Sequence, residues 1–166
     1  MKGVVNMMPK WGALLLMSLI TGVAHSSEPQ IFGWLEHGEI EGIALDFKLD
    51  TGADTSSLDA RSIREFDQDG KHWASFVVPS AADGEAHRFE RPIVRYALVR
   101  GAGGSERRPV VRMTVCLADE QYREEFTLND RSKMSYPVLI GRSTLQHMHA
   151  AVAAERQYTR QGDCAN

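Results

Sequence analysis

A short turn that carries an aspartate at its tip is the part of the sequence best suited to chemistry. The segment Leu49–Leu58 begins at the end of an apolar strand pattern, continues with Asp50, Thr51 and Gly52, and ends at another apolar residue. Gly52 lets the backbone turn and approach a partner closely, and Thr51 offers a hydroxyl that can brace the turn. The carboxyl of Asp50 then projects at the tip, where it can act as a base on water. A purely structural Asx-turn is the alternative interpretation.

A second segment, Met134–Arg142, follows about 90 residues later and ends in two hydrophobic residues, a glycine and an arginine. Together the two segments resemble the retropepsins, the single-domain aspartic proteases in which an Asp-Thr-Gly-Ala loop packs beside an Ile-Gly-Arg segment. In retropepsins, the acid after the loop pairs with the arginine after that glycine. The resemblance therefore implies structural support from Gly141 and an ion pair between Asp54 and Arg142.

The chain is similar over most of its length to a bacterial family of retropepsin-like proteins labelled putative ATP-dependent zinc proteases and associated with glutamate-ligase genes. The matching anchors are Phe32–Trp34, Asp50–Leu58 and Asp130–Arg142. The family usually carries a basic residue where Asp54 stands, so the Asp54 pair is an expectation taken from the viral-type retropepsins. The resemblance implies a mainly β, single-domain, retropepsin-like closed barrel with one short C-terminal helix.

The resemblance also implies an aspartic endopeptidase whose catalytic residue is Asp50, with Thr51, Gly52 and Ala53 as its active-site loop. Acid protease chemistry needs two carboxyl groups that share one proton, because two adjacent negative charges cannot both persist. The chain holds no second Asp-Thr-Gly or Asp-Ser-Gly. We therefore predict a two-fold homodimer that brings together one Asp50 from each chain and acts on a peptide or protein substrate.

A protease of this type needs a mobile cover over its cleft. The first candidate for the tip of such a flap is the glycine-rich segment 101–105, with Gly101, Gly103 and Gly104. The segment 80–85 is the second candidate. In the alternative interpretation, both are turns in solvent.

Two other functions compete with the endopeptidase. One is a non-catalytic module that holds a peptide or an envelope partner on the same fold, and the other is a metal-dependent hydrolase. The sequence has no His-Glu-x-x-His pair for zinc and no Gly-Lys-Ser/Thr loop for ATP, so we predict neither a metal nor another cofactor. The following histidines are interpreted as surface or packing residues: His37, His72, His87, His147 and His149.

The elements that position these residues are many short strands separated by turns, a pattern typical of a barrel or sandwich. Apolar residues alternate with Ala44, Asp46, Lys48 and Asp50 over residues 43–50, so Asp50 ends a strand and points away from its apolar row. Asp69-Gly70 predicts a hairpin turn. Further predicted strands are 63–66, 73–78, 88–99, 109–117, 122–128 and 136–140, and a helix is predicted over 143–148.

The first residues have the form of a secretory leader. Lys2 and Lys10 precede an uncharged run over Trp11–Ala24, which predicts a signal peptide cleaved after Ser26 and a mature domain of residues 27–166 in the periplasm or outside the cell. An uncleaved N-terminal anchor is the alternative. The run is too short to span a bilayer comfortably, so no stable membrane insertion is expected after cleavage.

Charge and cysteine content narrow the partners further. Without residues 1–26 the chain keeps 17 basic and 22 acidic side chains, a formal charge of −5, which gives no electrostatic reason to bind nucleic acid. Cys116 and Cys164 are the two cysteines. A disulfide between them in an oxidising compartment and a buried inert thiol at Cys116 are two interpretations that the sequence leaves open.

Overall fold

The computed structural model describes residue 3 and residues 28–80, 84–101 and 104–160. The predicted leader apart from residue 3, as well as Gly103 and Cys164, lies outside the described residues. The elements are β1 (Gln30–Ile40), β2 (Ile43–Leu49), β3 (Ser56–Asp59), β4 (Arg61–Gln68), β5 (Lys71–Pro79), β6 (Ala86–Gly101), β7 (Gly104–Leu117), β8 (Glu120–Asn129), β9 (Val138–Ile140), α1 (Arg142–His147) and β10 (Ala150–Gln157). The predicted fold class, mainly β with one short helix, is confirmed.

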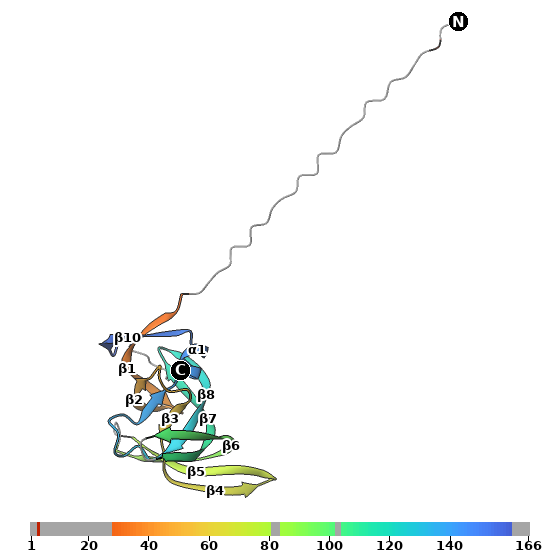
Figure 1. Ribbon diagram of the computed structural model, residues 1–166, viewed down its shortest axis with the longest axis vertical. Coiled ribbons are helices and arrows are strands. Elements are labelled where there is room, and N and C mark those ends of the chain that lie inside the picture. The colour runs from red at the N-terminus through yellow and green to blue at the C-terminus, as the bar shows by residue number, and fades with distance from the viewer. Residues whose placement is uncertain (1–2, 4–27, 81–83, 102–103, 161–166) are drawn as a thin grey trace.

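The strands form one sheet in the order β10-β1-β2-β9-β3-β8-β7-β6-β5-β4. A further pairing of β1 with β7, through Glu39 with Cys116 and Ile40 with Val115, closes six of them into a ring. Because only two residue pairs close it, the ring is less regular than the closed barrel that the sequence predicts. In Figure 1 the hairpin of β4 and β5 projects from one end of the fold, and β1 and β10 lie at the other.

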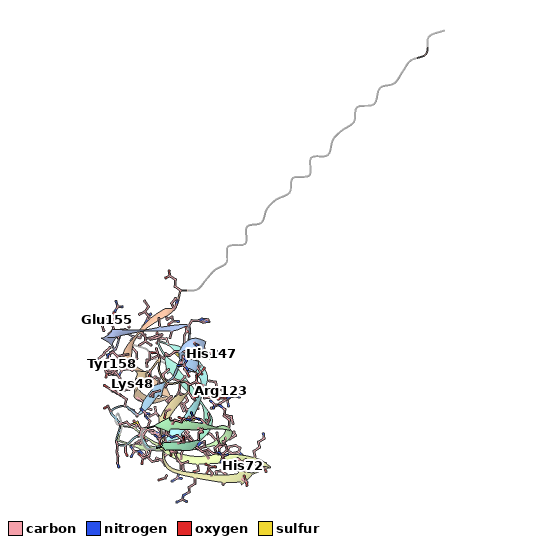
Figure 2. All side chains as sticks on the ribbon, viewed as in Figure 1. Lys48, His72, Arg123, His147, Glu155 and Tyr158 are labelled. Carbon is pink, nitrogen blue, oxygen red and sulfur yellow. The ribbon has the colours of Figure 1, made fainter. Side chains whose placement is uncertain are left out.

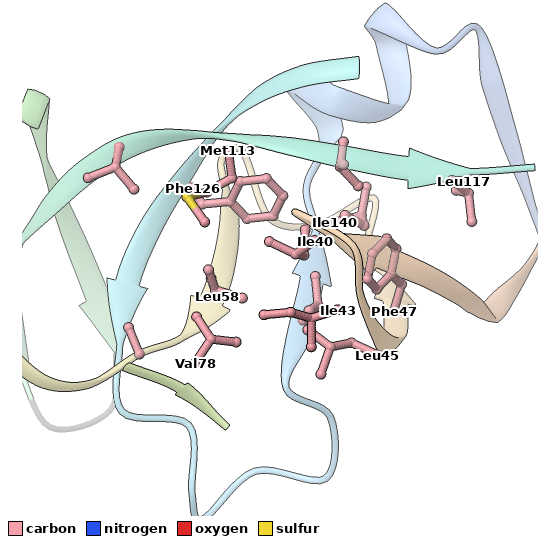
Figure 3. Packing of buried hydrophobic residues seen from close by; sticks show 14 of the residues in the cluster. Ile40, Ile43, Leu45, Phe47, Leu58, Val78, Met113, Leu117, Phe126 and Ile140 are labelled. Atoms are coloured by element: carbon pink, nitrogen blue, oxygen red, sulfur yellow. The ribbon is translucent and has the colours of Figure 1, made fainter. Parts of the chain in front are cut away.

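The core is built mainly from strand residues that alternate in and out, with Leu145 and Met148 added from α1 and its end. On β2, Ile43, Leu45, Phe47 and Leu49 are buried, as the period of two predicts. They pack with Ile140 on the neighbouring strand β9 and with Met113 and Phe126 on β7 and β8 (Figure 3). The outward row of β2 is thereby left to polar side chains, and Asp50 continues that row just beyond the strand's end.

The turns and strand limits agree with the sequence where local signals are strong. Asp69 and Gly70 have φ values of 51° and 72°, as a tight hairpin between β4 and β5 requires. The helix begins at Arg142 and ends at His147, one residue earlier than predicted at each end. Three strands were not predicted: β1, β10 and the four-residue β3, which lies between β9 and β8.

Cys116 is buried on β7 and is disulfide-bonded. Within the described part of the chain, no helix has the length and apolar character needed to cross a membrane.

The burial of Phe47 gives a first prediction. Replacing this fully buried phenyl group by a methyl group leaves a cavity among the strands. Phe47→Ala should therefore lower the free energy of unfolding by about 3–5 kcal/mol. Leu98→Ala, at a side chain that is 62% exposed, should change it by less than about 0.5 kcal/mol. Urea denaturation at one protein concentration measures both, and equal effects would contradict this placement of the core.

Candidate functional site

The turn that carries Asp50 joins β2 to β3, and both strands pair with β9. The backbone N–H of Asp50 donates to the carbonyl of Ile140 on β9 at 2.9 Å, which continues the ladder past the end of β2. Its carboxylate oxygen Oδ1 accepts from the backbone N–H of Gly52 at 3.0 Å and of Ala53 at 3.3 Å. The Asx-turn is therefore present. It occupies Oδ1 and leaves Oδ2 for other contacts.

The start of α1 clamps this turn from behind. The backbone N–H of Arg142 donates to the carbonyl of Ala53 at 2.8 Å, and that of Ser143 donates to the carbonyl of Asp54 at 3.1 Å. Gly141 makes the approach possible, because a Cβ atom there would lie 2.6 Å from the carbonyl carbon of Thr55. Two segments about 90 residues apart in the sequence are held against each other at this point.

The side chain of Arg142 adds a second layer to the clamp. Its Nη1 donates to the carbonyl of Thr51 at 3.1 Å, and its Nη2 donates to Oδ1 of Asp54 at 3.0 Å. The two side chains that the viral-type resemblance pairs are thus in contact. Both are largely exposed, so the bond to the carbonyl orients the turn more than the ion pair stabilises the fold.

The apex of the turn is open. Thr51 and Gly52 are exposed, and Ala53 is half-buried. The backbone of Gly52 is not in the left-handed region, so the turn itself does not require a glycine. The constraint is steric, because a Cβ atom at Gly52 would lie 3.2 Å from Oδ1 of Asp50. Gly52 therefore keeps the space beside the carboxylate free.

A buried polar network supports the clamp from inside. The hydroxyl of Ser56 accepts from the N–H of Gly141 at 3.0 Å and lies 2.8 Å from the hydroxyl of Thr144. Thr144 in turn donates to Glu124 at 3.1 Å, and Glu124 contacts His147 on the surface of α1. The sequence analysis assigned His147 to the surface or to packing and did not identify this network, whose members are distant in the sequence.

Lys48 is a site residue that the sequence analysis did not identify. Its Nζ lies 3.5 Å from Oδ2 of Asp50, the carboxylate oxygen that the turn leaves unused. The strand period gave a signal for this contact, because Lys48 and Asp50 are two positions apart and share the outward face of β2. Lys48 is labelled among the side chains in Figure 2.

A cleft of about 980 Å³ lies next to the turn. It is lined by residues 53–55 of the turn, residues 95–100 of β6 and residues 133–136 after β8. Among the residues that the structure describes, one acid, Asp54, and six basic side chains line the cleft, and the basic ones are Lys48, Arg95, Arg100, Arg108, Arg131 and Lys133. The exposed apolar side chains of Leu98 and Met134 belong to the same lining. Such a cleft suits an extended chain with negative charge.

Arg131 is the most buried of these cations, with 7% of its surface exposed. Its Nε donates to the carbonyl of Tyr136 at 3.1 Å, and its guanidinium forms no ion pair with the described residues. Burial lowers the pKa of Arg131 from its ordinary value, an effect that the negative charges of Asp59 and Asp50 oppose. The guanidinium remains charged at neutral pH because its ordinary pKa is so high.

The first flap candidate lies at the tip of the hairpin formed by β6 and β7, whose last paired residues are Gly101 and Gly104. Gly104 has a φ of +115°, a conformation that favours glycine, while Gly103 lies outside the described residues. The stem of this hairpin lines the cleft. In the second candidate, the N–H of Ser80 donates to the carbonyl of Glu85, and residues 81–83 lie outside the described part.

Within the described ranges, no group of three or more histidine, cysteine, aspartate and glutamate side chains is arranged to hold a metal ion.

A ring of strands with an aspartate turn clamped by a Gly-Arg helix start defines a retropepsin-like protein. The model of a family described as retropepsin-like aspartic endopeptidase RimB matches residues 31–163. The chain therefore belongs to this RimB-like family, and the resemblance found in the sequence is confirmed.

Relatives and a solved structure agree with this assignment. The chain is 33% identical over 115 residues to a probable alpha-L-glutamate ligase from Desulfotalea psychrophila, and 35% identical over 105 residues to one from Parasynechococcus marenigrum. The matches cover 68% and 61% of this chain but only 25% and 22% of those proteins. A crystal structure of a Legionella pneumophila protein of unknown function is similar with a TM-score of 0.70 and 28% identity, over 80% of this chain and 98% of that one.

The clamp gives the second prediction. Gly141→Ala forces a methyl group against the backbone of Thr55, so it should lower the free energy of unfolding by roughly 1–3 kcal/mol and speed amide hydrogen exchange at Ala53. Ser143→Ala, at an exposed neighbouring side chain, is the matched control and should change neither quantity. Protection at Ala53 that survives Gly141→Ala would show that the turn does not depend on the clamp.

Proposed function

We propose that this protein is an aspartic endopeptidase that works as a two-fold homodimer and cleaves acidic peptide segments. The observation that carries the proposal is the carboxylate of Asp50. The turn amides fix its Oδ1, whereas its Oδ2 faces no N–H donor of the turn. A fixed carboxylate with one available oxygen is what an acid dyad needs from each of its two halves.

The dimer supplies the other half of the dyad. Thr51 and Gly52 are exposed at the apex, so a second copy can approach there without displacing side chains of the core. With one Asp50 from each copy near the axis, one carboxylate takes a proton from water. The other, protonated, donates to the substrate carbonyl as the water attacks its carbon, and the resulting diol then collapses by breaking the C–N bond while the proton taken from water passes to the leaving amine. In this proposal Thr51 braces the two turns against each other.

The cleft supports an acidic substrate. Among the described residues that line it, basic side chains outnumber acidic ones six to one although the whole chain has a formal charge of −3, so positive charge is concentrated where a peptide would lie. Arg131 is buried there with no carboxylate in ion-pair contact among the described residues, and a bound acidic side chain would provide one. The relatives named as glutamate ligases fit this proposal, because a ligase of that name produces glutamyl linkages.

The hairpin of β6 and β7 is proposed as the flap. Leu98 and Arg100 on its stem line the cleft, so closing the hairpin over a peptide would bring an apolar and a basic side chain onto it. Cover of this kind excludes water from the reacting amide and orders the substrate.

The first test of this function is Asp50→Asn. Asparagine keeps the oxygen that accepts from Gly52 and Ala53 but cannot act as the base, so cleavage of a glutamate-rich peptide library should fall by roughly 10³-fold or more with an unchanged melting temperature. Asp46→Asn, on the same outward face of β2, is the matched control and should cleave like the wild type. Mass spectrometry from pH 4 to 8 measures the products.

The same assay tests the dimer. On dilution, activity per chain should fall in parallel with the dimer fraction from analytical ultracentrifugation, because one chain supplies only half of the dyad. Cleavage that persists in Asp50→Asn, or in a strictly monomeric sample, would remove the proposed mechanism. A monomer that binds acidic peptides without cleaving them would be the non-catalytic module.

The acidic preference has its own test. Arg131→Gln should lower kcat/KM for a glutamate-containing peptide by about tenfold and leave the glutamine-containing analogue nearly unchanged, because only the former loses a charge-assisted hydrogen bond. Arg64→Gln, on β4 away from the cleft, is the control and should affect neither peptide. Equal losses on both peptides would assign Arg131 to the stability of the cleft and not to charge recognition.

A further inference from the structure

Lys48 lies where the cleft meets the turn that carries Asp50. It lines the cleft, and its Nζ also lies 3.5 Å from Oδ2 of Asp50. The other acid on its strand face, Asp46, contacts His37 at 2.9 Å, which leaves Asp50 as the carboxylate that Lys48 contacts. The Lys48 side chain is 43% exposed and that of Asp50 29% exposed, so the pair is open to competition from a ligand in the cleft.

The contact between Lys48 and Asp50 opposes the proposed catalysis. The oxygen that Lys48 approaches is the one the turn leaves available for the dyad. A dyad must hold one shared proton, and an adjacent ammonium group opposes it because it stabilises two ionised carboxylates. In a two-fold dimer, one Lys48 from each chain would act on the dyad in this way.

We infer that Lys48 is a positioning residue which exchanges partners, pairing with Asp50 in the empty site and with an acidic side chain of the peptide when the cleft is filled. This inference rests on the proposed acidic-peptide function of the cleft. A carboxylate bound among Arg131, Lys133 and Arg100 lies in the same cleft as the Nζ of Lys48 and competes for it. The substrate's own charge then releases Oδ2 of Asp50 for the dyad, so an acidic peptide both binds and activates the site.

The inference makes a prediction about coupling. If the peptide and Asp50 compete for Lys48, removing the charge of Asp50 frees Lys48 for the peptide. Asp50→Asn should therefore tighten binding of a glutamate-containing peptide by roughly two- to fivefold, the range expected for an exposed ion pair. It should leave the matched glutamine peptide unchanged. In a Lys48→Gln background, the same Asp50→Asn change should have no effect on either peptide.

The experiment is a thermodynamic cycle by titration calorimetry. It uses the wild type, Lys48→Gln, Asp50→Asn and the double variant, at 4 °C with peptide integrity checked by mass spectrometry. Lys48→Arg keeps the charge and should restore the coupling, while melting curves confirm that each variant folds. Lys48 is half-exposed, so its replacement should leave the core intact.

Three results would overturn the inference. The first is unchanged affinity of Asp50→Asn for the acidic peptide, and the second is tightening that persists in the Lys48→Gln background, which would reflect general charge only. The third is absence of acidic-peptide binding by every variant. Because binding needs no turnover, a chain that shows the coupling without cleaving loses the endopeptidase proposal alone, whereas a chain that cleaves without the coupling loses only the role of Lys48.

Discussion

The contact between the Asp50 turn and the start of α1 is the constraint on which the site depends. Two backbone hydrogen bonds and the close approach of Gly141 to Thr55 join them. A turn at the end of an isolated strand would sample many conformations. Fixing its backbone in one conformation costs about 1–2 kcal/mol of conformational entropy per residue. Held from behind by Arg142 and from inside by the hydroxyl of Ser56, it presents one carboxylate in one orientation.

The same clamp explains why the site is built at this corner of the fold. Strands β2 and β3 lie on either side of β9, so the turn between them must cross the end of β9, where the chain continues into α1. The outward-facing Lys48 of β2 therefore lines the cleft, while the inward-facing side chains of the strand pack in the core. Lys48 and Asp50 are brought together by that alternation, and the apolar residues that bury the strand also fix the distance between its two charged groups.

Charge is distributed unevenly over the protein. The chain is weakly acidic as a whole, yet most of the charged residues described in the lining of the cleft are cations, contributed by β2, β6, β7 and the segment after β8. Some of these cations have carboxylate partners of their own, as Arg95 has with Glu125 and Arg108 with Glu106. Arg131 has none among the described residues. Because a buried unpaired charge is costly, an anion in the cleft would stabilise Arg131 more than the exposed cations.

The sequence by itself determined the strands with strict alternation, the Asp69-Gly70 hairpin and the turn around Asp50, because each follows from local residue types and spacing. Motif resemblance extended this to the family and to the pairing of Asp54 with Arg142. Only the tertiary structure decided the four-residue β3, the buried hydroxyl network and the cationic cleft. Their residues are far apart in the chain and meet only when the ring of strands closes, so no local pattern records their neighbours.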